Sequence, residues 1–168
     1  MKCQNCSEPI KSQRATKKFC SAGCKQAHYR DTRARIDVAA LFVREDSPYK
    51  AIPHVDCFDR ERDGLTFKGS VPVICHPPCR RFGKLRHFSK ASISEERLAH
   101  FSVERVRLNG GILEHPVDSK LWIDAELPYP GDYDEFGGWT LEVAQNMFGH
   151  RARKMTFLYI VGLRPEQL

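Results

Sequence analysis

Four cysteines near the N-terminus have the spacing of metal ligands. Cys3-x2-Cys6 and Cys20-x3-Cys24 form two close pairs that are separated by thirteen residues. Two such pairs can supply four thiolates in a tetrahedron, which is the geometry of structural zinc sites. The intervening residues 7–19 are too polar to form a core, so a bound metal would supply folding free energy. We therefore expect a structural Zn²⁺ site, although cysteine spacing alone also admits iron.

A fifth cysteine, Cys79, follows a short apolar run and two prolines in the stretch 70–81. The run predicts a buried strand that the prolines end abruptly. A parallel sheet presents this edge to ligands, and Arg80 and Arg81 follow the thiol directly. Neighbouring positive charge lowers a thiol's pKa and favours a nucleophilic thiolate. The residues leave a second interpretation equally open, in which Cys79 is an inert thiol at a proline-capped strand end.

Positive charge is concentrated in the N-terminal segment. Residues 1–36 hold nine Lys or Arg residues and two acidic residues, a net charge of +7, while the whole chain carries +6. A helix expected from about residue 20 to 36 carries Lys25, Arg30, Arg33 and Arg35. Such a surface can contact phosphates without reading sequence, so we expect a nucleic-acid partner. The alternative is a finger that only caps the main domain.

Composition indicates a folded protein, with 168 residues of which 41% are hydrophobic and 29% charged. No apolar run approaches the ~18 residues that a membrane span needs, and the N-terminus does not resemble a signal peptide. These features predict a cytoplasmic, reducing location without membrane association. Seven cysteines in such a compartment indicate metal binding or chemistry rather than disulfides. The oligomeric state is not predicted.

The remaining chain predicts an α/β domain. A helix is expected from about 92 to 108, beginning with a Ser92–Glu95 capping box and ending at Asn109-Gly110. Leu98, Phe101 and Val106 share one side of it. Strands are expected at 37–43, 54–59, 71–75, 111–116, 139–146 and 155–161. This order favours a mostly parallel sheet and two domains, at 1–36 and 37–168.

Three segments resemble, in order, motifs of the DNA cytosine-C5 methyltransferases. Pro77-Pro78-Cys79 resembles the catalytic Pro-Pro-Cys motif, and the strand end at Glu114 resembles the Glu-Asn-Val motif. Residues 148–162, with Arg151 and Arg153, resemble the arginine-containing segment and the strand that follows it. The resemblance covers roughly residues 38–164. Residues 1–36 resemble the second half of a treble-clef zinc finger, so the chain is similar to a small, reduced methyltransferase of the kind expected in phage genomes.

The resemblance implies a reduced Rossmann-like fold and a covalent mechanism. Cys79 would add to C6 of a cytosine, and Glu114 would bind the ring at N3. Arg151 or Arg153 would act as a base or contact a phosphate. Such addition activates C5 for methyl transfer. DNA rather than RNA is the expected partner, with Arg80 and Arg81 among its contacts, and a duplex target would need to be flipped out.

The resemblance also implies S-adenosylmethionine as cofactor, held at the ends of the first two strands by Phe42 and Asp59. The chain departs from the family because the turn 42–47 has no glycine and because His115 and Pro116 replace Asn-Val. Three functions therefore remain open: a methyltransferase-like enzyme, a catalytically inactive DNA-binding module, and a Cys-dependent enzyme with another base-modifying chemistry.

Overall fold

The computed structural model describes residues 2–4, 6–10, 18–26 and 36–168. The chain divides into two compact units, Met1–Ile36 and Asp37–Leu168, and each is described by itself. In the described ranges, every helix is too short or too polar to cross a membrane.

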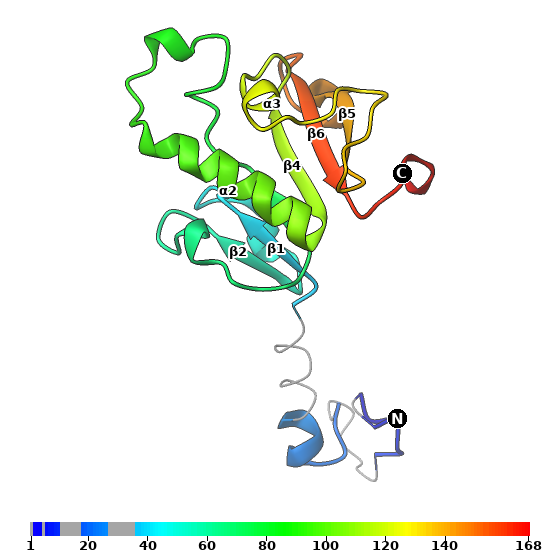
Figure 1. Cartoon of the computed structure of the whole chain (residues 1–168). Helices are drawn as coiled ribbons and strands as arrows, with labels where there is room; N and C mark the ends of the chain where they lie inside the picture. The colour runs from blue at the N-terminus through cyan, green and yellow to red at the C-terminus, as the bar shows by residue number, and fades with distance from the viewer. Residues whose placement is uncertain (1, 5, 11–17, 27–35) are drawn as a thin grey trace. The chain divides into compact units, whose positions relative to one another are not determined.

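The larger unit is built on one six-stranded sheet (Figure 1). Its spatial order is β2-β1-β3-β4-β6-β5. Strands β2, β1, β3 and β4 are parallel neighbours, whereas β6 is antiparallel to both β4 and β5. The strands are β1 (Val38–Leu41), β2 (Val55–Phe58), β3 (Val73–Cys75), β4 (Gly111–Pro116), β5 (Trp139–Ala144) and β6 (Met155–Val161). The expected α/β class is confirmed, and the sheet is mixed because β6 alone runs against the others.

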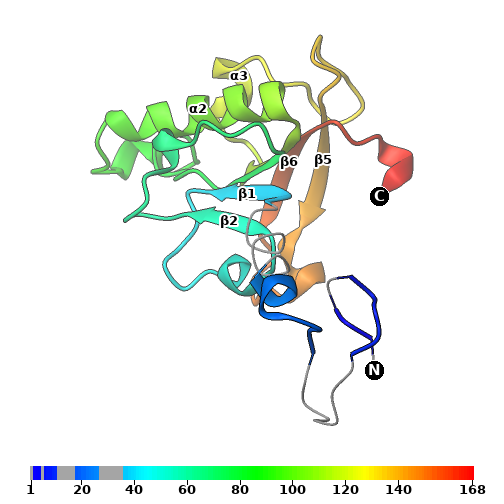
Figure 2. The same ribbon diagram turned by 90° about the horizontal axis from the view of Figure 1, so that it is seen from below.

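Helix α2 (Ser94–Asn109) packs against β3 and β4. The short helix α3 (Leu121–Asp124), which the sequence did not predict, lies on the same side of the sheet (Figure 2). The core fills the space between these helices and the strands, with Leu41, Leu113 and Tyr159 fully buried. The described residues also form five 3₁₀ turns, of which the last follows β6: η1 (Pro48–Ala51), η2 (Gly64–Thr66), η3 (Arg86–Phe88), η4 (Gln145–Phe148) and η5 (Pro165–Gln167).

The expected capping box at the start of α2 is wrong. Ile93 occupies the N-cap position and makes no side-chain capping bond. The Ser92 hydroxyl accepts a hydrogen bond from the Ser94 amide at 3.3 Å instead. Glu95 does not complete a box because its carboxylate forms an ion pair with Arg80.

The buried face of α2 also differs from the expectation. Ala99, Ser102, Val103 and Val106 are its buried residues. Leu98 and Phe101 lie at the edge of this face and are only partly buried. The centre of the buried face is therefore made of Ala, Ser and Val side chains, and the larger side chains lie at its margin.

Two consecutive glycines connect α2 to β4. Gly110 has a φ of +74° at the C-cap, as expected from Asn109-Gly110. Gly111 has a φ of +123°, and a Cβ there would lie 1.9 Å from the Val73 carbonyl oxygen. Only glycine therefore lets β4 begin in register beside β3.

Candidate active site and metal centre

The four N-terminal cysteines converge on one point. Their sulfur atoms all lie within 4.8 Å of one another. The Cys20–Cys24, Cys6–Cys20 and Cys6–Cys24 sulfur pairs are 3.3, 3.6 and 3.7 Å apart. A tetrahedral site with Zn–S bonds of ~2.3 Å has sulfur–sulfur edges of roughly 3.8 Å. The cluster is thus compatible with a structural metal ion.

A turn and a helix start bring the two cysteine pairs together. The Cys3 amide donates to the Glu8 carbonyl at 2.8 Å, which folds the first pair into a turn. Residues 22–26 are helical, and the Ser21 hydroxyl caps them by accepting from the Cys24 amide at 3.1 Å. Hydrogen bonds with Cys24, and then with Cys6 and Cys3, raise the pKa of Cys20 to about 12. A bound cation would be needed to hold these thiols as thiolates at neutral pH.

The predicted basic helix is only partly covered by the structure. Lys25 lies on the short helix and is exposed. Arg30, Arg33 and Arg35 lie outside the described residues, as does most of the expected helix extension to residue 36. Their contact with nucleic acid stays a prediction.

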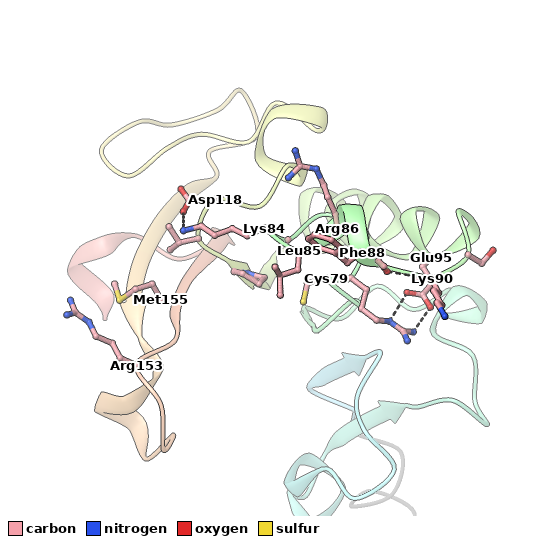
Figure 3. Close-up of a pocket in the computed structure, with 17 residues that line it drawn as sticks. Cys79, Lys84, Leu85, Arg86, Phe88, Lys90, Glu95, Asp118, Arg153 and Met155 are labelled. Carbon is pink, nitrogen blue, oxygen red and sulfur yellow. Dashed lines mark hydrogen bonds and ion pairs between the residues drawn. The ribbon is translucent and has the colours of Figure 1, made fainter.

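Cys79 lies on a tight turn that follows β3 directly. Its carbonyl accepts hydrogen bonds from the amides of Phe82 and Gly83 at 3.0 and 2.8 Å. Phe82 is buried and anchors the turn in the core. The Cys79 side chain is partly exposed and lines a cavity of about 1060 Å³ (Figure 3). The turn therefore holds a thiol at a fixed place on an accessible wall.

A buried histidine lies beneath this turn. The Nδ1 atom of His115 lies 2.6 Å from the Ser119 hydroxyl, which in turn accepts from the Leu121 amide. Its ring packs edge-on against Phe82, with the centroids 5.6 Å apart. Burial lowers the pKa of His115 to about 4, although Glu114 and the Pro78 carbonyl act in the opposite direction. A neutral imidazole thus joins β4 to the turn of Cys79.

The cavity beside Cys79 has a basic and apolar lining. Cationic side chains outnumber the acidic ones there, and apolar side chains complete the walls. Arg153 and Met155 lie across the cavity from Leu85 and Phe88 (Figure 3). The charged lining residues are Arg80, Lys84, Arg86, Lys90 and Arg153 against Glu95 and Asp118.

Arg80 and Arg81 are both held by helix α2. Arg80 forms an ion pair with Glu95, and Arg81 forms one with Glu96 at 2.9 Å. These pairs tie the turn of Cys79 to the start of α2. Arg80 stays mostly exposed and lines the cavity, whereas Arg81 does not line it.

Glu114 lies within the last half of β4, in a polar cluster. Its Oε1 atom accepts from the Gln145 amide at 2.9 Å and from the Lys154 ammonium at 3.3 Å. The Nδ1 atom of His76 lies 3.7 Å from Oε2. Burial raises the pKa of this carboxyl, but the His76 hydrogen bond and the Lys154 charge outweigh burial and lower the pKa to about 2. Glu114 is therefore a fixed, ionised acceptor.

His76 connects Glu114 to a second, smaller cavity. Its ring stacks on Tyr49 with centroids 5.6 Å apart, and its Nε2 lies 3.3 Å from the Tyr49 hydroxyl. Both residues line a cavity of about 390 Å³ at the carboxyl ends of β1 and β3. Phe42, Arg44 and Asp46 are also among its lining residues.

The predicted catalytic residues are brought to one edge of the sheet, but not into one cavity. Cys79 follows the carboxyl end of β3, and Glu114 lies within the last half of its parallel neighbour β4. Arg153 lines the cavity of Cys79, whereas Glu114 and Arg151 do not. Arg151 is exposed on the segment between η4 and β6. Cys79 and Glu114 thus lie toward the same edge of the sheet, but Glu114 is outside the cavity that Cys79 lines, and a shared catalytic role stays a prediction.

The two predicted cofactor residues have distinct surroundings. Asp59 accepts from the amides of Glu61 and Arg62, both at 3.0 Å, and pairs with Lys50. The Lys50 hydrogen bond is the main reason that the pKa of Asp59 is lowered to about 2. Phe42 lines the smaller cavity and has a φ of +59°, an unusual conformation for a bulky residue.

Sequence reasoning missed Gln145, Lys154 and Tyr49 as members of the site. Gln145 follows β5 and Lys154 precedes β6, so the reversed direction of β6 places Lys154 at the carboxyl end of β4. The sequence predicted both strands but not their directions. Only the antiparallel direction of β6 would have indicated that Lys154, which precedes β6, lies near Glu114.

Comparisons with protein-family models, with curated proteins and with solved structures find no match to this chain.

Proposed function

We propose that this protein modifies a pyrimidine base in DNA through Cys79, with S-adenosylmethionine as methyl donor, in the manner of the DNA cytosine-C5 methyltransferases. One observation carries the proposal: Cys79 lies on a rigid turn after a parallel strand and lines a large cavity with a basic rim. A thiolate at this position can react with a nucleotide base in the cavity, while the basic rim binds the phosphates of the same DNA strand.

The chemistry starts when the Cys79 thiolate forms a bond to C6 of the ring. The C5–C6 π pair becomes available at C5, where a bound S-adenosylmethionine would supply an electrophilic methyl group and its sulfur would keep the electron pair of the broken bond. A base then removes the C5 proton, and expulsion of the thiolate restores the double bond. Arg153 lines the same cavity and contacts a phosphate of the substrate.

Glu114 serves as an acceptor for the ring. An ionised carboxylate accepts hydrogen bonds but does not donate them. Oε1 already binds Gln145 and Lys154, whereas Oε2 has His76 alone among its contacts in the described part of the chain. Oε2 can accept a hydrogen bond from the exocyclic amine of cytosine, or from N3 when that atom becomes protonated. Because Glu114 does not line the cavity, the base has to extend beyond the cavity lining to make this contact.

The smaller cavity is the proposed cofactor site of a reduced Rossmann-like fold. In the sheet order, β2 lies on one side of β1 and β3 lies on the other. Ligands of open α/β sheets bind at such a switch point, outside the carboxyl ends of the strands. Phe42 and Tyr49 would flank the cofactor there. It would supply an electrophilic methyl group at a positively charged sulfur.

The N-terminal unit is proposed to be a treble-clef-like zinc finger that contacts DNA. Its cysteine cluster fits a tetrahedral Zn²⁺ site. Residues 1–36 carry a net charge of +7, which suits a polyanion. A cytoplasmic, reducing location would keep all of these thiols reduced.

A specific observation favours a second candidate, a catalytically inactive DNA-binding module. Both Asp59 oxygens are already engaged, by Lys50 and by two backbone amides. A ribose hydroxyl would therefore have to compete with Lys50 for Oδ2. Calorimetry separates the candidates, because the module binds DNA without binding S-adenosylmethionine.

The test is mass spectrometry of nucleosides from DNA incubated with the full chain and S-adenosylmethionine. We expect methylated cytosine with the wild type and with Cys57→Ser, a control in the partly buried Cys57 of β2. Cys79→Ser should give none. A different modified base would indicate the third, alternative chemistry. Modification that persists in Cys79→Ser would contradict the proposal.

A further inference from the structure

The segment between the Cys79 turn and α2 exposes apolar side chains instead of burying them. Phe88 is 84% exposed and Leu85 is 74% exposed. Both line the cavity of Cys79. In Figure 1 this segment, drawn in green before α2, extends away from the sheet and has a short helical turn within it. Exposed apolar side chains at the mouth of a cavity indicate a binding surface.

Local hydrogen bonds give this segment a defined shape. The Arg86 amide donates to the Gly83 carbonyl at 3.0 Å, and the Phe88 amide donates to the Leu85 carbonyl at 3.0 Å. The first bond closes the turn before η3 and the second belongs to η3 itself, so Leu85 and Phe88 lie within one turn of each other. A surface that is ordered before binding loses little conformational entropy when a ligand arrives.

Cationic side chains line the same cavity as the two apolar side chains. Two of the five cationic lining residues are neutralised, because Arg80 pairs with Glu95 and Lys84 pairs with Asp118. Arg86, Lys90 and Arg153 have no ion pair within the described ranges. An apolar partner protein would leave these three charges without counterions, whereas a DNA strand supplies both phosphates and aromatic faces.

We propose that residues 84–90 form a stacking platform for an unpaired DNA base next to the base at Cys79. Phe88 stacks on the neighbouring base, Leu85 fills the space beside it, and Arg86 and Lys90 bind the flanking phosphates. The platform rests on the proposed function, since it takes the Cys79 cavity as the place where the target base enters. It adds a substrate class: single-stranded or locally unpaired DNA.

The first test measures binding of a short cytosine-containing single strand, and of its duplex, by fluorescence anisotropy with the full chain. Loss of one base–aromatic stack weakens binding roughly 5- to 150-fold, so Phe88→Ala should lose at least about fivefold on the single strand. Phe148→Ala is the matched control, because Phe148 is 77% exposed and does not line the cavity. Equal affinity of Phe88→Ala and wild type, or an equal loss in Phe148→Ala, overturns the platform.

A spectroscopic variant tests stacking directly. Both native tryptophans, Trp122 and Trp139, are buried, so Phe88→Trp adds the exposed indole. Its emission should be quenched when the single strand binds, and Phe148→Trp should change little. Unchanged emission at saturating DNA would refute stacking.

The outcomes separate this inference from the proposed function. A wild type that binds neither DNA form contradicts both. A wild type that modifies DNA while Phe88→Ala binds normally contradicts only the platform, as does binding of duplex and single strand with equal affinity. Tighter binding of RNA with the same sequence counts against DNA as the partner.

Discussion

Replacing Glu114 by Gln should destabilise the protein in a pH-dependent way. The substitution keeps the shape of the side chain and removes the charge that holds Lys154 and His76. The pKa of Glu114 is lowered from 4.5 to about 2 by these partners, in spite of burial, and the side chain is only 19% exposed. One unit of pKa corresponds to about 1.4 kcal/mol, so the carboxylate contributes on the order of 3 kcal/mol at pH 7.

The sign follows from linkage between protonation and folding. The folded pKa is lowered, so the contribution is complete above the unfolded pKa of about 4.5 and is lost as the pH falls toward 2. The difference between wild type and Glu114→Gln should shrink from about 3 kcal/mol at pH 7 to about 1 kcal/mol at pH 3. Urea unfolding of both proteins at pH 7, 4 and 3 measures this difference.

Glu142→Gln is the matched control because Glu142 is an exposed carboxylate on β5. It should change the free energy of unfolding by less than about 0.5 kcal/mol at every pH. A Glu114→Gln effect that is the same at pH 7 and pH 3 would refute the polar cluster as described.

Three further predictions concern the metal, the buried histidine and the glycine bend. The full chain should bind one Zn²⁺ by elemental analysis, and Cys24→Ser should lose it while Cys57→Ser keeps it. Burial lowers the pKa of His115 from 6.5 to about 4, so wild-type stability should fall by about 3 kcal/mol as the pH drops from 6.5 to 4, and this part of the pH dependence should be absent in His115→Asn. Gly111→Ala should prevent folding, as judged by circular dichroism, because its Cβ would overlap the Val73 carbonyl, whereas Gly131→Ala meets no atom within 4 Å and should fold.

The sequence predicted most strands because each had a strong local pattern. The strand ranges 111–116 and 155–161 match β4 and β6 residue for residue, since glycines, prolines and charged residues bound both apolar runs. Strand direction has no local signature, so the antiparallel placement of β6 could not be predicted. Lys154 was therefore not recognised as a partner of Glu114.

Interactions between distant segments explain the other differences. The Ser92–Glu95 pattern matched a capping box, but Arg80 engages Glu95 from another part of the chain. Likewise, Asp59 was expected to be available for a cofactor, whereas Lys50 from η1 binds it. Cysteine spacing, by contrast, was sufficient to predict the convergence of Cys3, Cys6, Cys20 and Cys24. Two close cysteine pairs separated by a short loop are the spacing of a four-thiolate metal site.

The most direct test of the central claim uses DNA that contains 5-fluorocytosine. Fluorine replaces the C5 hydrogen that a base would remove, so the thiolate is not expelled and the covalent intermediate is trapped. Incubation of the full chain with this DNA and S-adenosylmethionine should give a stable covalent protein–DNA adduct. Peptide mass spectrometry should identify Cys79 as the residue that is bonded to the DNA. Absence of an adduct under these conditions, or an adduct on another cysteine, would contradict Cys79 as the nucleophile.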